Sequence, residues 1–298
     1  MVRRVLALTP ARIALAVLAA IAGLALFGPL LAPQDPLATS DHTLAAASGA
    51  HWLGTDYLGR DVLSRLLAGS RVSVLGSLEV AFTALAIGAV PGILSVHLGR
   101  AFEWITLRLA DTLVALPFLL FAVAVVALLG NGLTQAMLVT GALVSPLFYR
   151  VARAATLAVA RSPYVEAAVV SGASTGWIVR RHVWAKVLPP IAVALAQTVG
   201  VGFVIVSSLT FLGIGVQPPA PTWGGLLASD LGYLSYQPWA PLAPALLIMV
   251  TVWACNVLAD AVRDVSGEAG RTPAGRAGAR PDRRSQAGPA PAAAGGAR

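Results

Sequence analysis

The segment with the most direct chemical meaning is GASTG at residues 172–176, which matches the G-x-S-x-G pattern around a hydrolase nucleophile. In that pattern Ser174 would attack a carbonyl carbon, with His182 nearby as a base. The pattern also requires a preceding strand, an oxyanion hole and an acidic partner, whereas the residues before Gly172 have amphipathic, helical spacing. Five-residue matches are common in chains rich in Gly and Ala, so we interpret the segment as structural.

Metal and nucleotide chemistry have little support in the remaining residues. The four histidines are scattered and bring no Cys or paired acids at ligand spacing, and the single cysteine, Cys255, lies in an apolar run. No G-x-x-x-x-G-K-[ST] segment occurs, so ATP binding through a P-loop is not expected. We therefore predict that this chain is not an enzyme, has no metal site and binds no cofactor itself.

Composition indicates a membrane protein. The chain is 57% hydrophobic and 11% charged, against roughly 25% charged in soluble domains. Its net charge of +8 comes from residues that flank apolar segments or lie in the C-terminal tail, and no basic stretch is interleaved with aromatics. We therefore expect membrane lipid, and not nucleic acid, to be a partner.

Six apolar segments approach the roughly 20 residues that a membrane-spanning helix needs. They are residues 13–31, 72–98, a third segment that ends at Leu129, 133–149, 187–214 and 239–259. A cleaved signal peptide is the alternative for the first, but the run is longer than a signal core and lacks a clean cleavage site. The expected fold is an all-α integral membrane protein with six spans.

The distribution of basic residues predicts the topology. Of 21 Lys and Arg residues, only Arg60, Arg65 and Arg71 fall on the predicted outer side. By the positive-inside rule both termini lie in the cytoplasm. The chain then divides into a cytoplasmic N-terminus, the first span, an external loop with an interfacial helix, a five-helix core with a cytoplasmic loop, and a disordered cytoplasmic tail. In that order these are residues 1–12, 13–31, 32–71, 72–262 with the loop at 161–186, and 263–298.

Charged residues near the predicted span ends have structural explanations. For Asp111 and Asp260 the explanation is either extension of the side chain toward water or an ion pair with the neighbouring Arg108 and Arg263. Glu79 lies near an outer end, where its side chain would extend toward water. No residue suggests a proton relay at mid-membrane.

The cytoplasmic loop between the fourth and fifth spans predicts two short helices along the membrane. Pro163 suits a helix start with Ser162 as its cap, and Gly172 suits the turn that ends that helix. Two helices presented in this way form a projection that fits a groove of a soluble partner.

Several segments together resemble the permease subunits of binding-protein-dependent ABC importers of the dipeptide/oligopeptide/nickel family. The resemblance covers most of residues 51–264 and is strongest in HWLGTDYLGRDVLSRLLAGSRVS, YVEAAVVSGAS, LTFLGIGVQPPAPTWGGLL and NVLADAVRD. It implies a type I ABC importer-like fold, and the long first external loop indicates which of the two permease subunits this is. Two departures are Trp184-Ala185 in place of a Leu-Pro pair and Val206 in place of an acidic residue.

The resemblance implies roles for particular residues. Glu166, Ala167, Ala168 and Gly172 would form the EAA loop that couples to the ATPase, flanked by Arg150, Arg153, Arg180 and Arg181. The outer residues Asp56, Arg60, Asp61, Pro218 and Trp223 would dock the external binding protein and the partner permease.

The function implied is that of one permease subunit in the bacterial cytoplasmic membrane. It would form half of a translocation pathway for short peptides, with a homologous permease, two cytoplasmic ABC ATPase subunits or domains that use ATP and Mg, and an extracytoplasmic binding protein. Nickel chelates, glutathione and oligosaccharides are alternative substrates. A stand-alone secondary transporter or channel is a more distant alternative, and a membrane hydrolase built on Ser174 is another.

Overall fold

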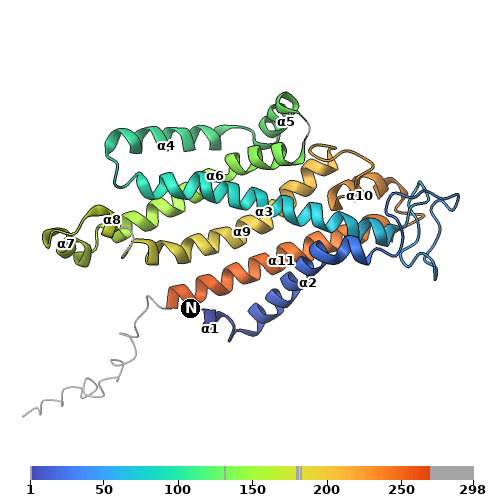
Figure 1. The fold of residues 1–298 in the computed structure, drawn as a ribbon, viewed down its shortest axis with the longest axis horizontal. Helices are drawn as coiled ribbons and strands as arrows, with labels where there is room; N and C mark the ends of the chain where they lie inside the picture. The colour runs from blue at the N-terminus through green and yellow to red at the C-terminus, as the bar shows by residue number, and fades with distance from the viewer. Residues whose placement is uncertain (1, 131, 179–180, 182, 269–298) are drawn as a thin grey trace, which may run out of the picture.

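A computed structural model describes residues 2–130, 132–178, 181 and 183–268, and the regular elements of these residues are helices (Figure 1). The helices are α1 (Val2–Val5), α2 (Thr9–Leu31), α3 (Val62–Leu94), α4 (Arg100–Ala115), α5 (Phe118–Leu129), α6 (Leu133–Ala160), α7 (Pro163–Val170), α8 (Thr175–Ile178), α9 (Trp184–Phe211), α10 (Trp223–Asp230), the 3₁₀ helix η2 (Leu231–Tyr233) and α11 (Trp239–Glu268). The predicted all-α membrane fold is confirmed.

Five of the described helices, α2, α3, α6, α9 and α11, are long and apolar enough to cross a membrane. A sixth span exists only if α4 and α5 are counted together, and these two are bent by 98° relative to one another. The break lies at Leu116, whose backbone is extended, and at Pro117, which lacks the N–H that would continue α4. The third predicted span is therefore broken.

Side chains of α6 hold α4 in place. The Arg150 guanidinium lies 2.9 Å from Oδ1 of Asp111, and the hydroxyls of Thr106 and Tyr149 are 2.9 Å apart. Arg153 pairs with Glu103. The predicted pair between Arg108 and Asp111 is wrong, because Asp111 faces α6 while Arg108 lies 5.9 Å from the ring centroid of Trp104. The pair between Arg263 and Asp260 is confirmed at 3.0 Å.

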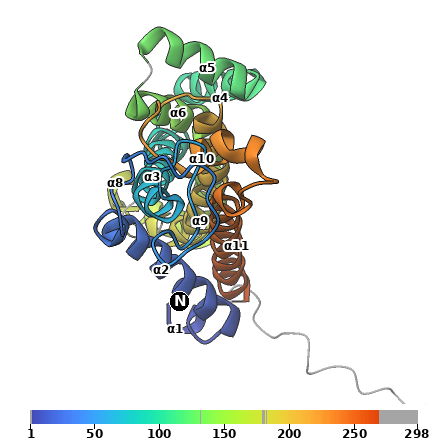
Figure 2. The same ribbon diagram turned by 90° about the vertical axis from the view of Figure 1, so that its right-hand side faces the viewer.

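Helix α3 is the central element of the bundle. It contacts α6 along one side and α2 and α9 along others, while α11 packs against α9 and α2 (Figure 2). The crossing of α3 and α6 is close because both helices place glycine there. A Cβ at Gly88 would clash with the Ser145 carbonyl, and one at Gly141 would clash with the Thr83 side chain. Small residues of this kind allow helix backbones to approach within a membrane.

The interfacial helix expected before the second span is not a separate element. Its apolar residues belong to α3, which begins at Val62 and continues without interruption to Leu94. The Asp61 carboxylate caps this helix by accepting hydrogen bonds from the backbone N–H and the hydroxyl of Ser64, at 2.8 and 2.7 Å.

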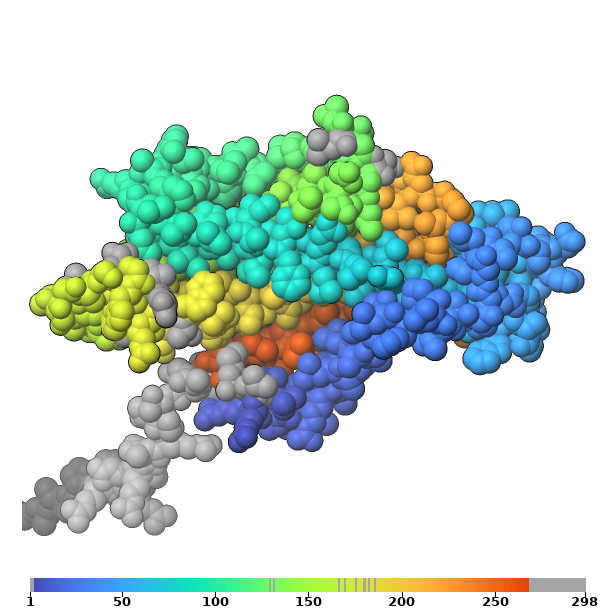
Figure 3. Space-filling model, in the orientation of Figure 1, coloured from blue at the N-terminus to red at the C-terminus, as the bar shows by residue number. Residues whose placement is uncertain are grey.

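The two ends of the bundle differ. Helices α7 and α8 project at one end, where α1 and the end of α11 also lie, and residues 32–61 and α10 lie at the other (Figures 1 and 3). These are called the α7 end and the α10 end below.

Candidate functional site

Helix α7 leaves the end of α6 through a two-residue turn. It starts at Pro163 as predicted, where the missing N–H costs no intrahelical bond. The hydroxyl of Ser162, the predicted cap of α7, donates to the Val159 carbonyl at 2.5 Å and so completes the end of α6.

The turn after α7 depends on Gly172. Its φ of +83° lies in the left-handed region, and the amide of Ala173 donates to the Ala168 carbonyl at 3.0 Å. This is the hydrogen bond of a Schellman helix end, for which glycine is the favoured residue. Nothing lies within 4 Å of a Cβ placed at Gly172. The requirement for glycine is therefore one of backbone conformation and not of space.

Ser174 starts the second short helix. Its Oγ accepts a hydrogen bond from the Trp177 amide at 3.4 Å, and its carbonyl accepts one from Ile178 at 3.1 Å. These contacts are those of a helix cap, which supports the structural interpretation of this serine. His182, the base considered for it, lies outside the described residues.

The inward side of α7 and α8 packs against the helix bundle. Val165 and Ile178 are buried in one cluster with residues of three long helices, called the junction cluster below. Its further buried members include Ile93 of α3, Phe148 of α6 and Val187 of α9. Helices α7 and α8 are therefore packed in one unit with α3, α6 and α9.

The outward side of α7 and α8 is apolar and exposed. Val170 is 89% exposed, and the rings of Tyr164 and Trp177 are about half exposed. Ala167 is also exposed, while Ala168 is partly buried against the junction cluster. Exposed apolar side chains at a membrane protein's aqueous end are typical of a protein–protein contact.

The four predicted coupling residues share this unit. Glu166, Ala167 and Ala168 lie in α7, and Gly172 forms the turn that follows. Position 166 stands between buried Val165 and exposed Ala167. Their contact with an ATPase stays a prediction.

The flanking arginines divide into two groups. Arg150 and Arg153 hold α4 on α6, so their described partners are within this chain. Arg181 is exposed, and Arg180 lies outside the described residues.

The α10 end contains a buried charge network centred on Asp56. Its Oδ2 lies 2.7 Å from Nε of Arg60 and 3.4 Å from Nε of Arg65, and its Oδ1 accepts from the backbone of Leu58 and Arg60. Asp56, Arg60 and Arg65 are all at least nine-tenths buried. Buried charges at this density require pairing, so the network fixes the outer loop on the start of α3.

The other predicted docking residues have mixed surroundings. Asp61 is buried and lies 3.0 Å from Nδ1 of His51. Trp223 is fully buried, and its Nε1 donates to the Leu66 carbonyl at 3.2 Å. Pro218 is exposed. Four of the five residues are thus engaged inside the chain, and docking through them stays a prediction.

Sequence analysis missed Asp230, the last residue of α10. It is buried, and its Oδ1 has no hydrogen-bond partner. Its burial, and to a smaller extent the nearby Asp56 carboxylate, raises the pKa of Asp230 to about 6. The signal available was a single acidic residue at the end of the apolar segment WGGLLASD.

Comparison with known proteins assigns this helical arrangement to a family. Residues 83–268 match the family described as "Binding-protein-dependent transport system inner membrane component". This range includes the junction cluster, α7, α8 and α10. The chain belongs to this family. It is accordingly a multi-pass inner-membrane transport component.

Relatives of this inner membrane component align over most of its length. It is 36% identical over 241 residues to the probable D,D-dipeptide transport system permease protein DdpC of Escherichia coli (strain K12), covering 80% of this chain and 81% of the relative. It is 36% identical to the glutathione transport system permease protein GsiD of Pectobacterium atrosepticum, covering 73% and 72%. It is 31% identical to the dipeptide transport system permease protein DppC of Alkalihalophilus pseudofirmus, covering 81% and 80%.

A solved structure supports the fold. The inward-facing MetNI methionine ABC transporter contains a chain that superposes with a TM-score of 0.56 at 20% identity, covering 67% of this chain and 96% of that one. The inner membrane component therefore has the fold of a type I ABC importer permease.

Proposed function

We propose that this permease forms half of a translocation pathway for short peptides and is driven by two cytoplasmic ABC ATPase subunits or domains through α7 and α8. A homologous second permease supplies the other half, and an extracytoplasmic binding protein delivers the substrate. We place both termini in the cytoplasm, which the basic residues at the α7 end favour under the positive-inside rule. The chain itself catalyses no reaction and binds no cofactor, because ATP and Mg act in the partner subunits.

The observation that supports this most strongly is the two-sided arrangement of α7 and α8. Their exposed face offers Val170 and Trp177 to a partner, while Val165 and Ile178 are buried among the ends of three spanning helices. A partner that pushed on this face would shift those helix ends as a packed unit. Coupling of this kind needs an element that is packed against the spanning helices and reaches the partner, and the burial and exposure of α7 with α8 support that role.

The substrate class is inferred from the relatives. Three of them are named for D,D-dipeptide, dipeptide and glutathione transport. These ligands share a short peptide or peptide-like backbone. Nickel chelates and oligosaccharides remain alternative substrates for the same architecture.

The test is reconstitution of the complete transporter in liposomes with its binding protein. We expect uptake of a labelled dipeptide that requires ATP, and loss of both uptake and substrate-stimulated ATPase activity in the Glu166→Lys variant while the variant still inserts. Cysteines introduced at positions 167 and 218 should react with impermeant reagents from opposite sides. Uptake without ATP or a second permease would instead support a stand-alone secondary transporter.

A further inference from the structure

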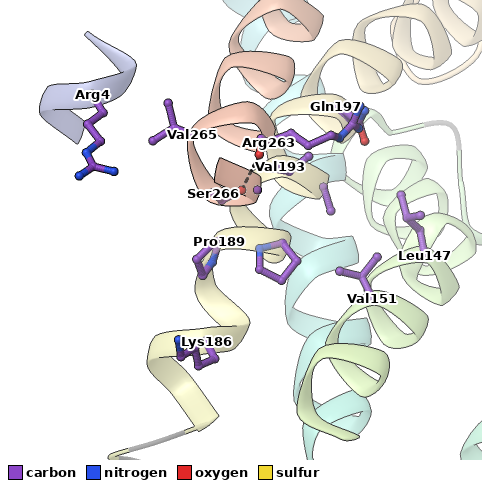
Figure 4. Close-up of a pocket in the computed structure, with 13 residues that line it drawn as sticks. Arg4, Leu147, Val151, Lys186, Pro189, Val193, Gln197, Arg263, Val265 and Ser266 are labelled. Carbon is purple, nitrogen blue, oxygen red and sulfur yellow. Dashed lines mark hydrogen bonds between the residues drawn. The ribbon is translucent and has the colours of Figure 1, made fainter. Parts of the chain in front are cut away.

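A cavity opens at the α7 end of this permease between α1, α6, α9 and α11 (Figure 4). Its volume is about 830 Å³. Pockets that hold a small molecule have volumes of roughly 300–1,000 Å³, so this cavity is large enough for more than ordered water. Neither the α7–α8 face nor the charge network at the α10 end includes its lining residues.

Three basic side chains from distant parts of the sequence line the cavity. Arg4 comes from α1, Lys186 from the start of α9 and Arg263 from the last turns of α11. No Asp or Glu among the described residues lines it. Arg263 has an exposed ion pair with Asp260, which at such exposure contributes little and leaves other guanidinium donors available. The opening is therefore positively charged.

The deeper wall is apolar. Leu147 and Val151 of α6 and Pro190, Val193 and Ala194 of α9 line it, and Figure 4 shows Leu147 and Val151 on the opposite side from Pro189 of α9. Gln197 is the deepest polar residue along α9. From Lys186 to Gln197 an α-helix rises about 16 Å, roughly half of the hydrocarbon thickness of a bilayer. The cavity thus passes from a charged opening to an apolar wall over the length of one lipid leaflet.

The charged opening lies near the ends of candidate membrane spans, where lipid headgroups are expected. Lys186 is the first residue of one candidate span, Arg263 lies four residues before the end of another, and Arg4 precedes the first. Basic pockets between spanning helices at the cytoplasmic surface are suited to anionic headgroups. A phosphate accepts hydrogen bonds from Arg and Lys, and an acyl chain matches the wall beyond it.

We propose that this cavity binds one anionic phospholipid of the inner leaflet, with its phosphate at the opening that Lys186, Arg4 and Arg263 line and an acyl chain along α9. The assignment to the inner leaflet rests on the orientation proposed above. Binding itself does not depend on orientation, on ATP or on the transported substrate. Because α1, α9 and α11 all contribute, the lipid would join the N-terminal segment to the last span beside α9.

The test uses the purified transporter complex in neutral detergent, titrated with phosphatidylglycerol and monitored by native mass spectrometry. Each of Lys186→Gln and Arg4→Gln should weaken binding about fivefold, and the double variant about 25-fold. The matched control is Arg100→Gln, because Arg100 is an exposed arginine at the start of α4 that does not line the cavity. Phosphatidylcholine should bind more weakly, and its affinity should be the same in the wild type and in all of these variants.

Three outcomes would overturn the proposal. Equal loss in the Arg100→Gln control would show general attraction to the basic surface. Unchanged binding in the double variant would exclude the cavity as the site. Displacement of phosphatidylglycerol by a short peptide, at the concentrations at which that peptide is transported, would assign the cavity to the substrate path. Failure of uptake in liposomes with these lipid results intact would contradict the proposed transport function alone.

Discussion

Arg60 donates a 2.7 Å hydrogen bond from Nε to Oδ2 of Asp56, and both side chains are almost completely buried. Arg60 also lies over the ring of Tyr57, which stacks on Tyr233 with centroids 5.3 Å apart. The Asp56 carboxylate therefore neutralises arginines inside the α10 end and helps to hold the outer loop against the segment after α10.

Substitution Asp56→Asn should destabilise the protein strongly. It keeps the shape of the side chain but removes the anion that pairs with buried Arg60 and Arg65, which costs about 3–5 kcal/mol in comparable cases. Thermal unfolding in detergent and hydrogen exchange of residues 42–60 would measure the loss. Asp41→Asn, at an exposed position of the same loop, is the control and should change little. Equal stability of the two variants would contradict the buried network.

The main effect of replacing Trp223 should be a loss of folding stability and not a loss of partner binding. Trp223→Ala removes a fully buried ring that stacks on Phe203 with centroids 5.9 Å apart. The expected loss of unfolding free energy is about 3–5 kcal/mol. Trp52→Ala is the matched control, because Trp52 lies in the same outer region and is 69% exposed. If Trp223→Ala lowered affinity for the binding protein with unchanged stability, docking would be its primary role.

Asp230 should make stability depend on pH. Burial and the Asp56 carboxylate raise its pKa from 3.8 to about 6, so between these values the folded chain binds more protons than the unfolded chain. Stability therefore falls as pH rises through that window and is then constant with respect to this group.

The variant Asp230→Asn should remove this dependence. At pH 7 it should be more stable than the wild type by roughly 2–3 kcal/mol, and below pH 4 the difference should vanish. Unfolding midpoints measured from pH 4 to pH 8 provide the comparison. The assignment would be contradicted if the wild-type unfolding midpoint rose with pH while the Asp230→Asn variant was more stable at every pH.

The long apolar helices were predictable because their signal is local. The first predicted span, 13–31, ends where α2 ends, and the last begins with α11 at Trp239. The broken third span was not predictable from proline alone. Pro91, Pro146 and Pro117 all lie in apolar runs, yet α3 and α6 continue through theirs. Long-range pairs from α6 hold α4 in place, and no local pattern encodes those pairs.

The candidate site was predictable in part for the same reason. Gly172 and Pro163 have local backbone roles, and both occupy them in the structure. The family resemblance places Asp56 and Arg60 on a docking surface, and it carries no information about their burial. Their burial depends on Arg65 and the α10 segment, which are close in space but come from other parts of the chain. Val206, which replaces the family's acidic residue, is buried in an apolar cluster, and this burial also depends on residues from other parts of the chain.

Gly172→Ala should reduce transport by changing the direction of α8. An L-residue in the left-handed region costs roughly 1–2 kcal/mol, and the turn can relieve that strain by moving α8 relative to α7. We expect peptide uptake and substrate-stimulated ATPase activity to fall together, at least fivefold, with normal insertion. The measurement is uptake by reconstituted transporter, with the amount of assembled complex determined in the same samples.

Gly176→Ala is the matched control for this effect. Nothing lies within 4 Å of a Cβ placed at either glycine, but only Gly172 has a positive φ. Gly176 lies inside α8, where alanine favours the helix. Both substitutions add a methyl group to the same projecting unit, so steric contact with a partner would affect both, whereas backbone strain arises only at Gly172. Reduced uptake in Gly172→Ala alone would assign the effect to the turn, and equal reduction in both would assign it to crowding of the partner's groove.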